Sequence, residues 1–228
     1  FEEILEAKKK FEGVVYPTPL LPNRNLSNDF RANILLKRED LQVVRSYKLR
    51  GAYNKIVQLT EQEKNNGVIC ASAGNHSQGV AYSCQQLNIK GKIVMPTTTP
   101  QQKIKQVKWF GKNQIEIILH GDTFDDASAF EHQLSQEGNI TFIHPFDDEK
   151  VIAGQGTVAL EILNQCDQPI DYIFVPIGGG GLASGVISVM KTLSPNTKII
   201  GVEPSGAASM AEAIKQKQSV ALAKIDPF

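Results

Sequence analysis

Short runs rich in β-branched residues alternate with longer segments of helical periodicity, and this alternation constrains the fold more than any other feature of the chain. The expected strands are Ile34–Lys37, Val68–Ala71, Lys92–Met95, Ile115–Leu119, Thr141–His144, Tyr172–Pro176 and Lys198–Glu203. The expected helices between them include Leu49–Leu59, Gln78–Leu87, Gln101–Phe110, Asp125–Gln136 and Ile152–Gln165. Because strands separated by single helices form βαβ units, the sequence predicts an α/β fold with open parallel sheets flanked by helices.

Two of the expected strands have almost wholly apolar centres. These are Ile173–Val175 and Ile199–Val202, and such runs are typical of strands covered on both faces. The first belongs to an uncharged segment, Tyr172 to Met190, that is nearly long enough to span a bilayer. Pro176 and the glycines Gly178–Gly181 would break a spanning helix there, so we expect a strand, a loop and a helix.

The composition is that of an ordinary globular protein, with 41% hydrophobic and 21% charged residues. Its 24 basic residues balance its 24 acidic ones, so no overall field favours nucleic acid or a membrane surface as a partner. Cys70, Cys84 and Cys166 form no CxxC pair, and Phe1–Phe11 mixes charged with apolar residues, unlike a signal peptide. We therefore expect a cytoplasmic protein without a disulfide framework.

Parallel sheets bind ligands at the carboxyl ends of their strands, and three loops at such positions are unusual. The first, Arg45–Gly51, carries Lys48 at the start of an expected helix, with Ser46 as its expected N-cap. Most helix lysines are solvated charges, and the local sequence alone favours that interpretation. The alternative is a Schiff-base lysine, a primary amine that is partly desolvated so that it can lose its proton.

The second loop, Ser72–Gly79, follows an expected strand directly. Its small residues leave backbone N–H groups pointing outward at a helix start, where they suit a carboxylate or a phosphate, and Ser72 and Asn75 add side-chain hydrogen bonds. A plain helix cap explains the same residues equally well. His76 has no second ligand at metal-binding spacing, so no metal is predicted and a capping or packing role is the default.

The third loop contains four consecutive glycines, Gly178–Gly181, between a strand and a helix. Four glycines in a row cost folding entropy, which favours a phosphate cradle at the helix N-terminus over a bare turn. The loop also matches a dinucleotide fingerprint through Gly178, Gly180 and Ala183, with Glu203 as the ribose-binding acid. A nicotinamide-binding oxidoreductase domain is thus the rival class, although it leaves the other two loops without a role.

Taken together, the motifs of this chain resemble the serine/threonine dehydratases, among the tryptophan-synthase-β-like (fold type II) pyridoxal 5′-phosphate enzymes. The segment around Leu41–Lys48 and the segment His144–Asp148 are most similar to the biosynthetic threonine deaminases of isoleucine synthesis. The matching segments follow the family's order through nearly the whole chain: Lys37–Asp40, Ser46–Ala52, Ser72–Gly79, Val151–Thr157 and Gly178–Leu182.

The resemblance implies roles for the matching residues. Lys48 would hold the cofactor as a Schiff base and later remove the α-proton, and Asn75 would bind the cofactor's 3′ oxygen. Tyr47 departs from the commoner Phe beside the cofactor. The phosphate site would be lined by Gly178, Gly179, Gly180, Gly181 and Leu182. The substrate carboxylate would be held by Ser72, Ala73, Gly74, Asn75 and His76.

The resemblance also implies an architecture and an activity. A larger catalytic domain would combine residues 1–65 with 148–228, a smaller α/β domain of residues 66–147 would be inserted, and the cofactor would lie in the cleft between them. The reaction would convert L-threonine to 2-oxobutanoate and ammonia, the first step of isoleucine synthesis, with side activity on L-serine. A catabolic serine/threonine dehydratase and a serine racemase are the alternatives. The family further implies a homo-oligomer, a dimer or a tetramer.

Both ends of the chain look cut, because it lacks an initiating Met and stops at Phe228. In the family, a hydroxyl-bearing residue that meets the cofactor's pyridine nitrogen and an isoleucine-binding regulatory domain would follow that position. We therefore expect these residues alone to turn over threonine slowly and to leave apolar surface exposed at an interrupted sheet.

Overall fold

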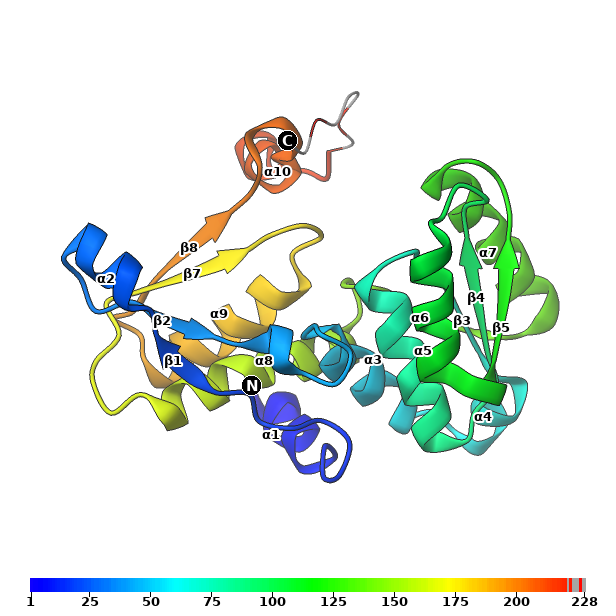
Figure 1. Cartoon of the computed structure of the whole chain (residues 1–228), viewed down its shortest axis with the longest axis horizontal. Coiled ribbons are helices and arrows are strands. Elements are labelled where there is room, and N and C mark those ends of the chain that lie inside the picture. The colour runs from blue at the N-terminus through cyan, green and yellow to red at the C-terminus, as the bar shows by residue number, and fades with distance from the viewer. Residues whose placement is uncertain (221, 223–225, 227–228) are drawn as a thin grey trace.

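The protein is described by a computed structural model covering residues 1–220, 222 and 226. Figure 1 shows two lobes joined through α3 (Lys48–Val57). The four-stranded lobe contains α4 (Glu61–Asn66), β3 (Val68–Ala71), α5 (Asn75–Leu87), β4 (Gly91–Met95), α6 (Gln101–Gly111), β5 (Ile115–Leu119), α7 (Phe124–Gly138) and β6 (Thr141–Phe142). The split lobe, so named because it combines both ends of the chain, contains α1 (Glu2–Lys9), β1 (Leu20–Pro22), α2 (Arg24–Phe30), β2 (Leu35–Lys37), α8 (Glu149–Gln165), β7 (Tyr172–Pro176), α9 (Gly181–Leu193), β8 (Lys198–Val202) and α10 (Ser209–Gln216).

The four-stranded lobe is built on a parallel sheet with the strand order β5-β4-β3-β6. Alternate residues of β3 face opposite sides: Val68 and Cys70 join the core under α5 and α6, whereas Ile69 packs with α7. From β3 the chain continues to β4 and β5 on one side and then returns as β6 on the other side. The carboxyl ends of β3 and β6 therefore form a topological switch point, where open parallel sheets bind ligands.

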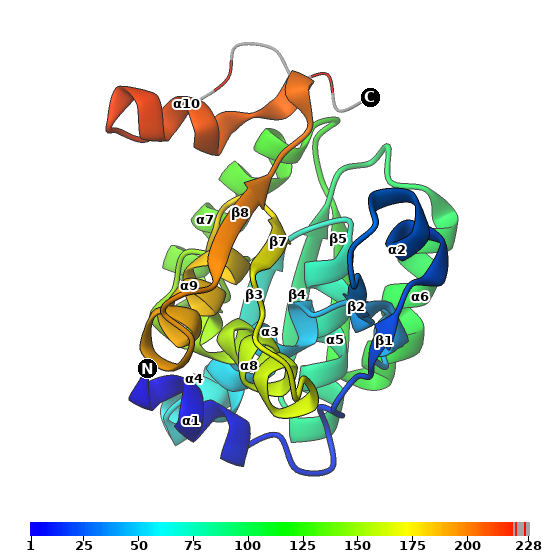
Figure 2. The ribbon, with the colours of Figure 1, turned by 90° about the vertical axis from the view of Figure 1, so that its left-hand side faces the viewer.

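The split lobe contains two short sheets, an antiparallel β1–β2 pair and a parallel β7–β8 pair. Figure 2 shows α8 and α9 beside β7 and β8. One face of the β7–β8 pair packs on this core through Ile173, Val175 and Ile199. On the other face, Tyr172 and Phe174 are 51% and 68% exposed. The expectation that both strands are covered on two faces is therefore wrong for the part of the chain that the structure describes.

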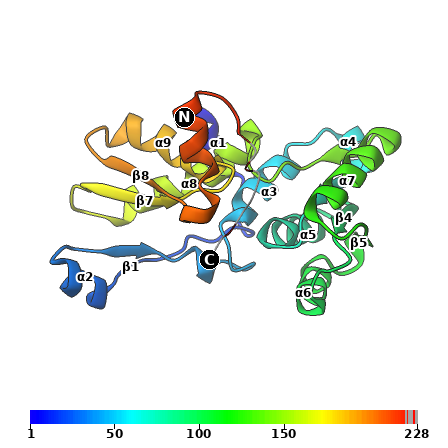
Figure 3. The same cartoon turned by 90° about the horizontal axis from the view of Figure 1, so that it is seen from above.

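Helix α3 belongs to the cores of both lobes, and Figures 1 and 3 both place it between them. Leu49 and Tyr53, one turn apart, pack into the core of the split lobe. Ala52 and Ile56, also one turn apart, pack into the core of the four-stranded lobe. Because one broad apolar face of α3 packs into both cores, its first residue, Lys48, is held at the junction of the lobes.

The parallel α/β architecture was predicted, and most element boundaries lie within two or three residues of expectation. Strand β1 was missed because its three residues are too few to show a period. The strand expected at Thr141–His144 ends at Phe142. Ser46 is not the N-cap of α3; that position is Tyr47, although Ser46 Oγ accepts the N–H of Lys48 at 3.2 Å.

The uncharged segment from Tyr172 to Met190 is a strand, a loop and part of a helix, as predicted. Across the residues that the structure describes, no helix combines the length and the apolar character needed to cross a membrane. The predicted division into a discontinuous larger domain and an inserted smaller one stays a prediction.

Because α7 buries a carboxyl group, we expect the free energy of unfolding to depend on pH. The Glu131 side chain is fully buried, and neither of its oxygens has a hydrogen-bond partner among the described residues. The exposed ring of His132, the next residue in the chain, has its Nδ1 3.9 Å from Glu131 Oε2. Burial raises the pKa of Glu131 to about 7 from its ordinary 4.5, so the folded protein keeps this proton to a higher pH than the unfolded chain does.

The stabilising effect of that retained proton is complete below pH 4.5 and is lost as the pH rises through 7. Glu131→Gln should therefore raise the free energy of unfolding at pH 8 by about 3 kcal/mol more than at pH 4, judged by urea denaturation at both pH values. Glu137→Gln, an exposed position on the same helix, is the matched control. Equal effects of Glu131→Gln at the two pH values would contradict the prediction.

Candidate active site

The switch point between β3 and β6 places two chain segments side by side. The expected carboxylate-binding loop follows β3, and a segment that we call the hub, residues 143–146, follows β6. His76 joins them, because its Nε2 lies 2.8 Å from the carbonyl oxygen of Ile143. Burial lowers the pKa of His76 to about 3, so the ring is neutral and Nε2 carries the donated hydrogen. Its Nδ1 is then a buried acceptor without a partner among the described residues.

Lys48 lies next to the hub. Helix α5 crosses the start of α3 at Gly79, where an added Cβ would lie 3.1 Å from the carbonyl of Lys48, so a glycine permits the close approach. Lys48 Nζ donates a hydrogen bond of 2.6 Å to the carbonyl oxygen of Pro145. Burial lowers the pKa of Lys48 to about 8 from 10.5. The amine is thus desolvated, as a nucleophilic lysine requires.

The glycine loop, Gly178–Gly181, connects β7 to the N-terminus of α9 and also contacts the hub. A Cβ added at Gly179 would overlap the ring of Phe146, and one at Gly181 would lie 2.7 Å from the Phe146 carbonyl oxygen. Gly180 has a φ of 88°, in the left-handed region that favours glycine. The absence of side chains therefore lets this loop close on Phe146 with its backbone at the positive end of α9.

The hub thus contacts all three loops that the sequence singled out. His144 shapes it, because its Nδ1 accepts the N–H groups of Phe146 and Asp147 at 3.2 and 2.6 Å. In the sequence, only the family resemblance of His144–Asp148 drew attention to this segment. Its position after the strand that reverses the sheet order is the signal that would have identified it, but the order of strands is a tertiary property.

The predicted site residues differ in their exposure and in their hydrogen bonds. The Asn75 side chain is exposed at the first position of α5, and Gly178 is exposed with open space around it. Ser72 Oγ accepts the N–H of Gly74 at 3.2 Å, which folds that loop on itself. The assigned role of each residue stays a prediction, but the three loops do lie around one segment.

A phosphorylated aldehyde cofactor fits this group of residues. The N-terminus of α9 offers backbone donors for a phosphate, and Lys48 offers the amine for a Schiff base. Gln155 adds a further observation: it is buried, and both polar atoms of its amide lack partners among the described residues. Its Oε1 lies 2.8 Å from the place of a Cβ at Gly181, so an unsatisfied amide adjoins the glycine loop.

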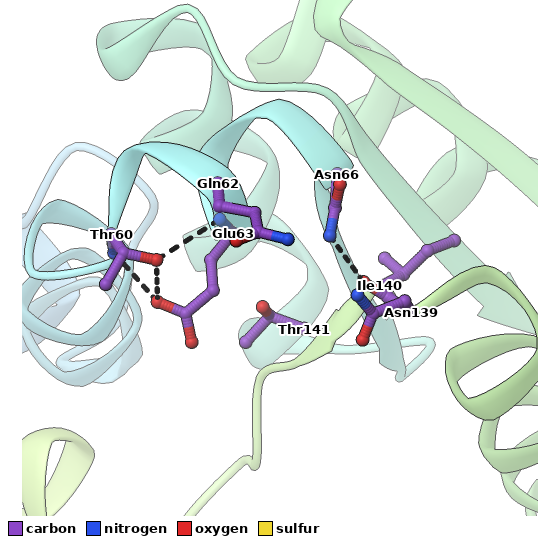
Figure 4. A pocket seen from close by; sticks show the side chains of 7 residues that line it. All are labelled: Thr60, Gln62, Glu63, Asn66, Asn139, Ile140 and Thr141. Atoms are coloured by element: carbon purple, nitrogen blue, oxygen red, sulfur yellow. Dashed lines mark hydrogen bonds between the residues drawn. The ribbon is translucent and has the colours of Figure 1, made fainter.

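A hollow of about 310 Å³ lies on the four-stranded lobe and is not lined by residues of the hub (Figure 4). Its polar groups largely satisfy one another. Thr60 and Glu63 form a capping box, and Asn66 Nδ2 donates to the Asn139 carbonyl oxygen at 3.1 Å. None of the predicted site residues lines this hollow, and its own residues offer no convergent group for chemistry.

The structure does not support Glu203 as the ribose-binding acid of a dinucleotide site. Both carboxylate oxygens of Glu203 accept backbone N–H groups at the start of α10, from Met210 at 2.9 Å and Ala211 at 2.8 Å. Glu203 therefore acts as a helix-capping residue rather than as a free acid at a ribose site.

The chain belongs to the pyridoxal-phosphate dependent enzymes, a family that matches its residues 11–227. This membership confirms the predicted family, its α/β fold and the cofactor. Over 227 residues the chain is 56% identical to the L-threonine dehydratase biosynthetic IlvA of Halalkalibacterium halodurans, covering 100% of this chain and 55% of that protein. The corresponding protein of Bacillus subtilis is also 56% identical, with 54% of it covered.

Solved structures agree with this assignment. The processed form of threonine deaminase isoform 2 from Solanum lycopersicum superposes with a TM-score of 0.95 at 46% identity, covering 100% of this chain and 62% of that one. Maize serine racemase superposes with a TM-score of 0.93 at 32% identity, covering 99% of this chain and 67% of that one. The chain spans about half the length of the curated relatives that it matches.

Proposed function

We propose that the whole protein is a pyridoxal-phosphate-dependent threonine dehydratase that converts L-threonine to 2-oxobutanoate and ammonia in isoleucine synthesis. The observation that carries the proposal is the desolvated amine of Lys48 at a sheet switch point, beside a glycine loop at a helix N-terminus. The 56% identity to proteins named biosynthetic threonine dehydratases supports the substrate. The cofactor, when bound, supplies an electron sink that makes the α-proton of an amino acid removable.

The chain's own residues would position the reactants. Lys48 Nζ would hold the cofactor and would be the base that accepts the α-proton. The carbonyl of Pro145 is a fixed acceptor 2.6 Å from that nitrogen, so it orients the amine for proton transfer. The backbone of the glycine loop would bind the phosphate.

The Ser72–His76 loop would bind the substrate carboxylate at the N-terminus of α5. Ser77 Oγ and Ser72 Oγ both bond to the backbone of Gly74, which holds the loop in shape without occupying the N–H groups of the first turn. The neutral state of His76 keeps a positive charge out of this position, so binding would depend on backbone dipoles. Carboxylate binding of this kind would align the Cα–H bond with Lys48 Nζ.

A thermal-shift experiment tests the cofactor class together with the reaction. Pyridoxal 5′-phosphate at 100 times its Kd should stabilise the whole protein by about 2.7 kcal/mol, and NAD at the same concentration should not. The loaded protein should then form 2-oxobutanoate from threonine. Stabilisation by NAD alone would contradict the proposal and favour an oxidoreductase.

A serine racemase is the second candidate, because maize serine racemase shares the fold at 32% identity. Formation of D-serine without oxo-acid from threonine would favour it. The predicted cytoplasmic location and homo-oligomeric state are further proposals, supported by the family alone.

A further inference from the structure

Four charged residues form a cluster beneath the start of α3. They are Lys37, Glu39, Arg50 and Glu161, which belong to β2, the turn that follows it, α3 and α8. Their side chains are between 0% and 13% exposed, so the cluster is almost wholly removed from water. Two cations and two anions balance, as buried charges require.

Arg50 is the centre of this cluster and is fully buried. Its Nε and Nη2 donate to the two oxygens of Glu39 at 2.8 and 2.7 Å. Its Nη1 and Nη2 donate to the two oxygens of Glu161 at 2.6 and 2.9 Å. A further bond from Nη1 to Thr157 Oγ1, at 3.1 Å, completes the set of five N–H donors that a guanidinium has.

Glu161 extends the cluster. Its Oε2 also accepts a hydrogen bond from Lys37 Nζ at 2.6 Å and one from the backbone N–H of Thr18 at 3.2 Å. Thr18 Oγ1 in turn bonds to Glu39. The cluster thus joins three separate parts of the chain, around Thr18, Lys37–Glu39 and α8, to the helix that begins at Lys48.

We propose that Arg50 is a positioning residue for Lys48: its two bidentate ion pairs fix the first turn of α3 against α8 and so hold the Lys48 amine at the hub. The proposal rests on the assignment of Lys48 as the cofactor lysine. Arg50 lies two residues after Lys48, so its side chain leaves the same helical turn in another direction.

The backbone contacts of Arg50 also support its role in positioning Lys48. A Cβ added at Gly154 of α8 would overlap the Arg50 carbonyl, so the two helices touch at that residue. In the same turn, Gly79 of α5 adjoins the Lys48 carbonyl. The turn is therefore packed between two helices, and the guanidinium determines its rotation because two planar bidentate pairs admit one geometry.

The alternative is that the cluster only stabilises the fold, and two variants of the whole protein separate the two roles. Arg50→Met leaves an uncompensated buried negative charge and should lower the Tm. Arg50→Met combined with Glu39→Gln restores neutrality and leaves the Lys37–Glu161 pair intact, so most of the stability should return. If Arg50→Met does not fold, the double variant still carries the test.

The measured quantity is the reactivity of the Lys48 amine in cofactor-free protein. Acetic anhydride acylates the amine at a series of pH values, and mass spectrometry quantifies the acylated Lys48 at each pH. In the wild type the midpoint should lie near the pKa of about 8. In the double variant a loosened turn should admit water to the amine, raise the midpoint by about one unit and slow labelling at pH 7 about tenfold. Recovery of both the Tm and the wild-type labelling profile would overturn the proposal.

Ile56→Ala, in the last turns of α3 and fully buried, is the matched control: it should lower the Tm without moving the labelling midpoint. A shift of the midpoint with Ile56→Ala as large as with the double variant would also overturn the proposal. Borohydride reduction of the cofactor-loaded wild type separates a failure of the Lys48 assignment from a failure of the positioning role of Arg50. Label on another lysine refutes the assignment of Lys48, whereas label on Lys48 with an unmoved midpoint in the double variant refutes positioning alone.

Discussion

Replacing Lys48 with alanine in the whole protein is expected to lower threonine turnover by at least about 10³-fold while leaving the fold intact. In the proposed function the amine would have two roles, as the cofactor's covalent partner and as the base for the α-proton, and alanine would supply neither. The fold should survive because Nζ donates a hydrogen bond to the Pro145 carbonyl, and a bond of this kind contributes only about 1–3 kcal/mol to stability. The measurements are initial rates of 2-oxobutanoate formation at saturating cofactor, with circular dichroism to monitor folding.

Lys55→Ala is the matched control, because Lys55 lies on the same helix and its ion pair with Asp148 is partly exposed. Turnover should stay within about twofold of the wild type, since pairs of this kind contribute about 1 kcal/mol or less. Borohydride reduction of the wild type should attach the cofactor to the peptide containing Lys48. A Lys48→Ala protein that retained a tenth of wild-type turnover would show that another amine performs the chemistry.

The second large effect is expected at the glycine loop, where Gly179→Asp should raise the Kd for pyridoxal 5′-phosphate by about 10²-fold or more. The new side chain would overlap the Phe146 ring, which would have to move away. Its charge would also repel the phosphate, and two like charges about 4 Å apart near a protein surface cost about 4 kcal/mol. Equilibrium dialysis of the cofactor against the whole protein measures the change.

Gly179→Asn has nearly the same size without the charge and separates the two contributions. It should weaken binding through the Phe146 overlap alone, and so less than Gly179→Asp does. If the Asp and Asn variants bound the cofactor equally well, the phosphate would not lie at this loop. Added salt should reduce the difference between the two variants, because it screens the charge of a partly exposed loop.

Much of the site's chemistry was predictable because it depends on local sequence. Glycines in succession before an expected helix favour a backbone that binds a phosphate over a bare turn. The small residues after β3 fit an anion-binding backbone and a plain helix cap equally well. Neither pattern identifies the ligand, and it was the order of all the motifs together, through their family resemblance, that selected pyridoxal phosphate over a dinucleotide.

Other features depend on contacts between distant segments and could not be predicted from the chain alone. The desolvation of Lys48, the contact of Phe146 with Gly179 and the capping role of Glu203 all require knowledge of which helices pack together. The same holds for Glu131, which a helical pattern with charged neighbours would place at the surface. Exposure is a property of the assembled fold, so a charged residue has no sequence signal for burial.

The sequence by itself determined the alternation of strands and helices, the positions of the loops that we propose to bind anions and the family, because each is carried by residue type and spacing within short segments. The tertiary structure alone decided which segments meet. It placed residues 143–146 between the three loops by returning β6 to the far side of β3. It also paired Arg50 with two carboxylates, one of them 111 residues away in sequence, beneath the turn that begins at Lys48. Such contacts form because burying the helix faces brings their polar residues together, and only complementary charges can be buried there without a large loss of stability.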